Sequence, residues 1–120
     1  MAKEVESLSF DFAVKAVKFS KVLKNDYKEF EIASQFLRSA TSVGANICEA
    51  KYGQSRADFI SKMSIARKEA NETKYWLRLL VASDIVSEAT VKNLLKEITE
   101  IIIVLTAIIK NTATTPNNKS

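Results

Sequence analysis

The sequence predicts an all-α protein, an up-down-up-down antiparallel four-helix bundle. Hydrophobic residues recur every three or four positions along most of the chain, which is the period of an amphipathic helix. With only two glycines and one proline in 120 residues, the chain offers few turns and therefore few, long elements. A length of 120 residues suits one domain with one modest core. We expect that domain at residues 1–111 and a disordered polar tail at 112–120.

The first two helices are expected at residues 9–24 and 29–50. In the first, Phe12, Phe19 and Leu23 fall on one face at about 100° per residue and predict its buried side. The polar stretch 25–29 interrupts this pattern before the second helix begins. That helix carries an apolar stripe and, opposite it, a polar stripe, namely Gln35, Arg38, Ser39, Ser42, Asn46 and Glu49.

The third and fourth helices are expected at residues 55–82 and 87–110. Ser55 suits the N-cap of the third helix, and Ser83 or Ser87 suits that of the fourth. The third helix has a heptad-like apolar series, namely Phe59, Met63, Ala66, Ala70, Thr73, Leu77 and Leu80. Short connections between the four helices make neighbouring helices antiparallel, which predicts the bundle.

The fourth helix is apolar on more than one side. Ile103, Val104 and Ala107 point away from the face predicted to be buried. A small domain cannot surround such a helix alone, and exposed apolar patches often mark interfaces. We therefore expect these three residues at a contact between copies of the chain, although tolerated exposed aliphatic residues are the alternative.

The polar stripe of the second helix predicts a structural polar network. An antiparallel hairpin about residues 52 and 53 brings Arg38 near Glu69 and Glu72 on the third helix, and Glu49 level with Arg56. We expect this network to lie buried in the seam, where an Arg–carboxylate pair would specify register. The alternative is an ordinary solvated face. The full expected set is Arg38, Ser42, Asn46, Glu49, Glu69 and Glu72.

Residues typical of catalysis are scarce. The chain has no histidine, and Cys48 is its single cysteine. Sequence patterns for phosphate loops, zinc proteases and serine hydrolases are absent. We expect no enzyme, no cofactor and no small-molecule substrate; a metal enzyme using Glu69 and Glu72 is the least favoured hypothesis. Because no window reaches the length of a membrane span, we expect no membrane contact and a cytoplasmic location.

A basic ridge on the third helix is the remaining electrostatic feature. Arg56, Arg67, Lys74 and Arg78 share one side of the helix, opposite its acids, and Tyr75 lies at the margin. Such a surface is a candidate contact for the phosphates of structured RNA or another nucleic acid, although a solvated helix face explains it equally well. The competing hypothesis is a scaffold that docks a partner protein through the apolar patch of Phe10, Val14 and Val17.

The stretches "QFLRSATSVGANICEA" and "DFISKMSIARKEANETKYWLRLL" resemble the bacterial four-helix bundle family of 23S rRNA-intervening sequence proteins. The similarity covers nearly the whole chain; one departure is Ala50, where many members have glycine. It also extends to the accessory proteins of diversity-generating retroelements, which bind nucleic acid and a reverse transcriptase. The resemblance implies a ring-like homopentamer. It implies no established biochemical role.

Overall fold

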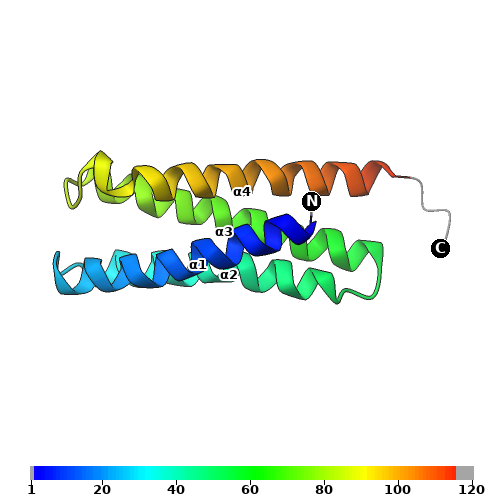
Figure 1. The fold of residues 1–120 in the computed structure, drawn as a ribbon, viewed down its shortest axis with the longest axis horizontal. Helices are drawn as coiled ribbons and strands as arrows, with labels where there is room; N and C mark the ends of the chain where they lie inside the picture. The colour runs from blue at the N-terminus through cyan, green and yellow to red at the C-terminus, as the bar shows by residue number, and fades with distance from the viewer. Residues whose placement is uncertain (1, 116–120) are drawn as a thin grey trace.

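The computed structural model describes residues 2–115, and it confirms the all-α four-helix bundle (Figure 1). The four helices follow one another in antiparallel order and are joined by short turns. The molecule is elongated, with extents of 53 × 20 × 19 Å. The helices are α1 (Ala2–Asn25), α2 (Glu31–Lys51), α3 (Arg56–Ala82) and α4 (Glu88–Thr114).

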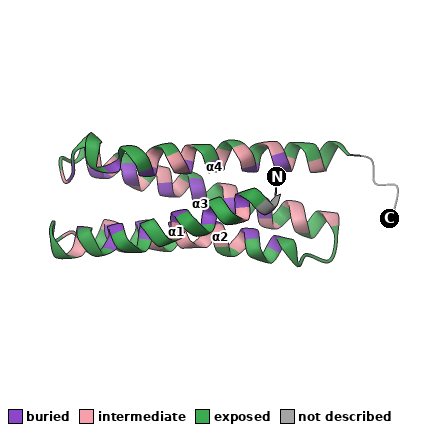
Figure 2. Cartoon of the chain, in the orientation of Figure 1, coloured by how far each residue is buried: buried purple, intermediate pink, exposed green. Residues whose placement is uncertain are grey.

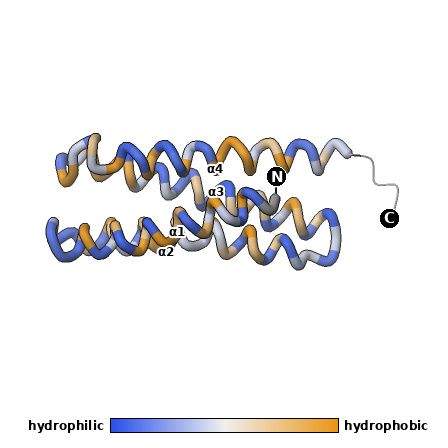
Figure 3. Tube along the Cα trace, in the orientation of Figure 1, coloured by the Kyte–Doolittle hydropathy of each residue, from blue (hydrophilic) through white to orange (hydrophobic). Residues whose placement is uncertain are grey.

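One hydrophobic core runs along the bundle axis. Each helix turns one stripe of side chains inward and leaves the rest in solvent, as the alternating burial along every ribbon shows (Figure 2). The inward stripes coincide with the hydrophobic positions (Figure 3). α2 packs most extensively against α3, whereas α1 and α4 make the smallest of the helix–helix interfaces. The α2–α3 interface is therefore the most extensive in the bundle.

Two helices are longer than the sequence predicted. α1 begins at Ala2 rather than near residue 9, because Val5 joins the core fully buried and extends the inward stripe by two turns. α4 continues to Thr114 rather than ending at residue 110. Residues 112–114 of the predicted tail are thus helical, and residues 116–120 lie outside the described part of the chain.

The turns explain where the helices begin. Lys28, in the turn between α1 and α2, has a left-handed backbone conformation with a φ of 56°. The carboxylate of the next residue, Glu29, accepts a hydrogen bond from the backbone N–H of Ile32 at 2.7 Å. α2 therefore starts at Glu31, two residues later than predicted. Ser55 and Ser87 cap α3 and α4 by accepting hydrogen bonds from the third residue beyond each, as expected.

α1 and α2 approach closely where α2 has a glycine. A Cβ placed on Gly44 would lie 3.4 Å from Ser9 Oγ and 3.6 Å from the Ser9 carbonyl oxygen. Ser9 is itself buried, and its hydroxyl donates to the Glu6 carbonyl at 2.9 Å. Small side chains at both positions thus set the distance between these two helices.

The outer side of α4 is less apolar than the sequence predicted. Ile103 is 62% exposed, but Val104 and Ala107 are half-buried, and Val104 packs against the core. The difference arises because Val104 lies on the flank of α4 rather than opposite its core stripe. None of the helices in the described part of the chain is long and apolar enough to cross a membrane.

Candidate functional site

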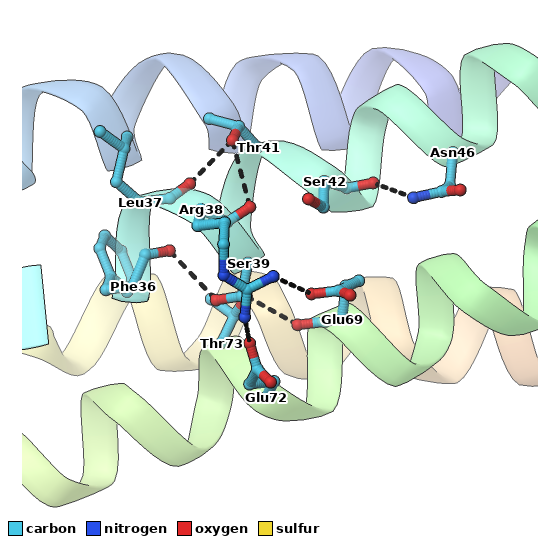
Figure 4. Close-up of polar contacts among 10 residues, drawn as sticks. All are labelled: Phe36, Leu37, Arg38, Ser39, Thr41, Ser42, Asn46, Glu69, Glu72 and Thr73. Carbon is cyan, nitrogen blue, oxygen red and sulfur yellow. Dashed lines mark hydrogen bonds and ion pairs between the residues drawn. The ribbon is translucent and has the colours of Figure 1, made fainter. Parts of the chain in front are cut away.

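Arg38 on α2 joins two carboxylates on α3 (Figure 4). Its Nη2 donates a hydrogen bond to Glu72 Oε2, and its Nη1 lies 3.7 Å from Glu69 Oε1. Residues 69 and 72 are one turn apart and share a face of α3. The planar guanidinium reaches both. The predicted pairing of Arg38 with Glu69 and Glu72 is therefore present.

The predicted burial of this network is wrong for its central residue. The Arg38 side chain is 53% exposed, whereas those of Glu72 and Glu69 are 34% and 17% exposed. Arg38 lies on the outer side of α2, so its stem runs over the seam and its head group stays in contact with solvent. An ion pair with this exposure contributes modestly to stability.

The remaining predicted members do not join this network. Glu49 accepts a hydrogen bond from Lys62 Nζ at 2.9 Å, a partner on α3 that the sequence did not predict. Asn46 donates to the Ser42 carbonyl of its own helix at 2.8 Å. Ser42 and Asn46 thus contribute local contacts on α2, and among the described residues neither side chain forms a hydrogen bond or ion pair with α3.

The buried polar link between α2 and α3 is formed by Ser39 and Thr73. Both residues are fully buried, and the Thr73 hydroxyl lies 2.9 Å from Ser39 Oγ, to which it donates. Ser39 in turn donates to the Phe36 carbonyl at 3.1 Å (Figure 4). The sequence placed Ser39 on the polar stripe and Thr73 in the apolar series. Only the hairpin register brings their hydroxyls together.

Two buried polar atoms in the described part of the chain lack a hydrogen bond, and both belong to α3. They are Glu69 Oε1 and the indole Nε1 of Trp76. For Glu69 the nearby Arg38 guanidinium supplies electrostatic compensation at 3.7 Å. Glu69 is therefore the member of the network that depends most on Arg38.

This arrangement gives no indication of catalysis. Glu69 and Glu72, the two carboxylates of the metal-enzyme hypothesis, are both paired with Arg38. Among the described residues, no group of three or more His, Cys, Asp or Glu side chains comes close enough to hold a metal ion. The carboxylates of the α2–α3 seam are thus already paired with Arg38.

Three of the four predicted basic-ridge residues form one surface, which we call the basic face: Arg67, Lys74 and Arg78. At 100° per residue they fall within an arc of about 40° on α3. Arg67 and Lys74 are half-buried, and Arg78 is exposed. None of the three forms an ion pair with a described residue; the ion pairs given above and Lys15–Glu97 and Lys51–Glu6 involve other side chains.

Arg56, the fourth predicted ridge residue, differs from these three because it is engaged in a contact of its own. It is half-buried in the first turn of α3. It lies about 16 Å along the helix axis from Arg67, the same distance that separates Arg67 from Arg78. Helix phase groups it with the other three, but phase does not report local partners.

A hollow beside the basic face was not predicted. It has a volume of about 530 Å³ and lies between α3 and the start of α4. A smaller neighbouring hollow shares Glu88 and Leu95 with it and adds the exposed Lys92 to this side of the bundle. The first hollow is lined by Tyr75, Arg78, Leu79, Val81, Ala82, Glu88 and Leu95. Lys92 was not among the residues predicted from the sequence, because its position beside this hollow depends on how α4 packs against α3.

The fold and its surfaces define an elongated antiparallel four-helix bundle with an ion-paired α2–α3 seam and a cationic side. The sequence model of the 23S rRNA-intervening sequence protein family matches residues 2–107. The chain therefore belongs to this family, as the resemblance predicted.

A solved structure supports the same assignment. A protein from Bacteroides thetaiotaomicron, described as one of unknown function from the S23 ribosomal protein family, superimposes with a TM-score of 0.89. Its sequence is 48% identical, and the alignment covers 91% of this chain and 97% of that one. No curated protein matches the sequence.

Proposed function

We propose that this protein is a non-enzymatic, homo-oligomeric nucleic-acid-binding protein that contacts structured RNA through the basic face. The observation that carries the proposal is that Arg67, Lys74 and Arg78 lie on one side of α3 without an ion-pair partner among the described residues. Cationic side chains without an ion-pair partner attract phosphates, and each phosphate that they neutralise releases counterions from the nucleic acid. A formal net charge of +4 favours the same class of partner.

Self-association would repeat the basic face on one particle. Several weak contacts then bind together through effective concentration, so an assembly can hold RNA that one subunit cannot. Ile103, which is 62% exposed, is the residue of α4 that best supports an intermolecular contact. Mass measurement in solution, with Ile103→Glu as the variant, tests this part; the variant is expected to lower the mass, and an unchanged mass would contradict the role of Ile103.

The experiment for the basic face is a charge reversal. Purified protein is titrated against labelled ribosomal RNA fragments at several salt concentrations, because the family name makes these the natural first probe. The triple variant Arg67→Glu, Lys74→Glu, Arg78→Glu is expected to lose most of its affinity. A steep loss of wild-type affinity with salt is also expected, since each phosphate contact adds about 0.7 to 0.9 to the slope of log K against log salt.

A matched variant distinguishes binding through the basic face from a general effect of net charge. Lys18→Glu, Lys21→Glu, Lys24→Glu makes the same change in charge on α1, and this variant is expected to retain binding. Equal losses in the two triple variants would show that charge alone is responsible. No wild-type binding at low salt would end the proposal.

The second candidate function is docking of a partner protein between α1 and α2. Phe10 is 68% exposed and, with Gly44, Cys48 and Tyr52, lines a hollow of about 750 Å³. Val14 and Val17, 41% and 40% exposed, continue the apolar surface. This function predicts salt-insensitive binding that Phe10→Ser weakens and the basic-face variant does not. Co-purification from cells with both variants distinguishes the two candidates.

A further inference from the structure

The hollow between α3 and α4 combines an aromatic ring, a cation and an apolar floor. Leu79 and Leu95 line it from two helices, and Tyr75 and Arg78 line it from α3. A volume of about 530 Å³ lies in the range of small-molecule sites. This composition differs from that of the hollow between α1 and α2, where Lys51 is the cation and is paired with Glu6 at 3.6 Å.

Tyr75 is placed to act as a stacking surface. It is 55% exposed, and in sequence it lies between two members of the basic face, Lys74 and Arg78. Its ring packs against Trp76 with centroids 5.1 Å apart and an interplanar angle of 75°. This edge-type contact restrains the tyrosine while more than half of its surface stays accessible. Restraint before binding lowers the entropy that stacking would otherwise cost.

We propose that this hollow receives an unpaired base of a single-stranded nucleic acid, which stacks on Tyr75 while an adjoining phosphate contacts Arg78. The inference rests on the proposed function and specifies its ligand: single strands, loops or ends rather than continuous duplex. Aromatic side chains beside cations are how proteins hold single strands, because every base offers a π-face. In a continuous duplex both faces of each base are covered by its neighbours.

Glu88 limits how the strand can lie. It is the one carboxylate among the described residues that line the hollow, and it repels phosphate. The phosphate is therefore directed towards Arg78 and Lys74, and the base edge towards Glu88. A carboxylate accepts hydrogen bonds from the N–H groups on a base edge. The charges at the two sides of the hollow thus give the bound nucleotide one orientation.

The test compares single-stranded with duplex probes of equal length. Affinities of labelled RNA and DNA oligonucleotides are measured by fluorescence anisotropy for the wild type, Tyr75→Ala, Tyr75→Phe and Tyr52→Ala. Tyr52 is a matched control, because it is 72% exposed and lies in the turn after α2, away from the hollow. Thermal unfolding shows whether each variant is folded. Trp76, the single tryptophan of the chain, reports directly on Tyr75 in the wild type.

The expected result is a selective loss. Tyr75→Ala weakens binding of single strands by about 5- to 150-fold, the range for loss of one base–aromatic stack, and leaves duplex binding unchanged. Tyr75→Phe and Tyr52→Ala bind as the wild type does, and single strands change Trp76 fluorescence. Comparison of RNA with DNA probes shows whether the sugar contributes.

Other outcomes separate this inference from the proposed function. Equal losses for both kinds of probe, or no loss, would overturn the stacking role of Tyr75. Binding of duplex but not of single strands would overturn it as well and leave the basic face as a nucleic-acid surface. A wild-type protein that binds neither probe would overturn both proposals.

Discussion

Replacing Arg38 with alanine tests whether the α2–α3 ion pairs stabilise the bundle. The pair with Glu72 is partly exposed, so its loss costs about 0.2 to 1 kcal/mol. Glu69 adds to this cost, because its side chain is only 17% exposed and Arg38 is its counter-charge. The two glutamates, one turn apart, then also repel each other by a few tenths of a kcal/mol. With about 1 kcal/mol assigned to Glu69, we expect Arg38→Ala to lower the free energy of unfolding by about 1.5 to 2 kcal/mol.

The assay is urea unfolding followed by circular dichroism at fixed protein concentration. The midpoint is expected to fall with the slope of the transition unchanged, which would indicate a change in stability rather than in compactness. The loss of stability caused by Arg38→Ala is expected to become smaller as sodium chloride is added, because salt screens exposed charges. Arg78→Ala is the matched control: this arginine on α3 is exposed and has no ion-pair partner among the described residues. It is expected to change stability by less than about 0.5 kcal/mol.

A double-mutant comparison decides whether the carboxylates are responsible. In a background of Glu69→Gln and Glu72→Gln, Arg38→Ala is expected to cost much less than in the wild type. The reasoning would be refuted if Arg38→Ala left the urea midpoint unchanged. It would also be refuted if the cost were the same with both glutamates neutralised, since the loss would then come from packing of the arginine stem.

Two further predictions concern packing. Ile98 is fully buried, so Ile98→Ala is expected to lower the free energy of unfolding by urea by about 2 to 5 kcal/mol. Ile103→Ala, on the exposed side of the same helix, is expected to lower it by less than about 0.5 kcal/mol. Similar losses for the two variants would contradict the assigned core face of α4. Gly44→Ala is expected to raise stability by up to about 1 kcal/mol, since its Cβ meets Ser9 Oγ at an ordinary contact distance of 3.4 Å. Gly44→Leu is expected to destabilise the protein, because its side chain overfills the contact between α1 and α2. A less stable alanine variant would show that the α1–α2 contact has no space for a methyl group.

The core could be predicted well because it depends on helix period alone. Met63, Ala70 and Leu77 are buried as the apolar series of the third helix indicated, and Ser55 caps that helix as its type and position suggested. Helix ends were predicted less well. Val5 stands between Glu4 and Glu6, and only its burial in the core shows that it extends α1.

The candidate sites depended on relations between helices, and these were predicted in part. Arg38 and its two glutamates were found from an approximate hairpin register, because a long side chain tolerates an error of one turn. The same estimate did not find Lys62, which donates a hydrogen bond to Glu49. Short side chains require an accurate register, and so the Ser39–Thr73 hydrogen bond was not found from the sequence.

The sequence by itself determined the fold class, the buried stripe of each helix and the family, because period, composition and local motifs are properties of a single segment. Tertiary structure alone decided that Arg38 is exposed and that Tyr75 and Arg78 line a hollow with Leu95. Each of these facts depends on how one helix is rotated and shifted against another. That rotation and shift are set by packing of the whole core, which no single segment of the sequence specifies.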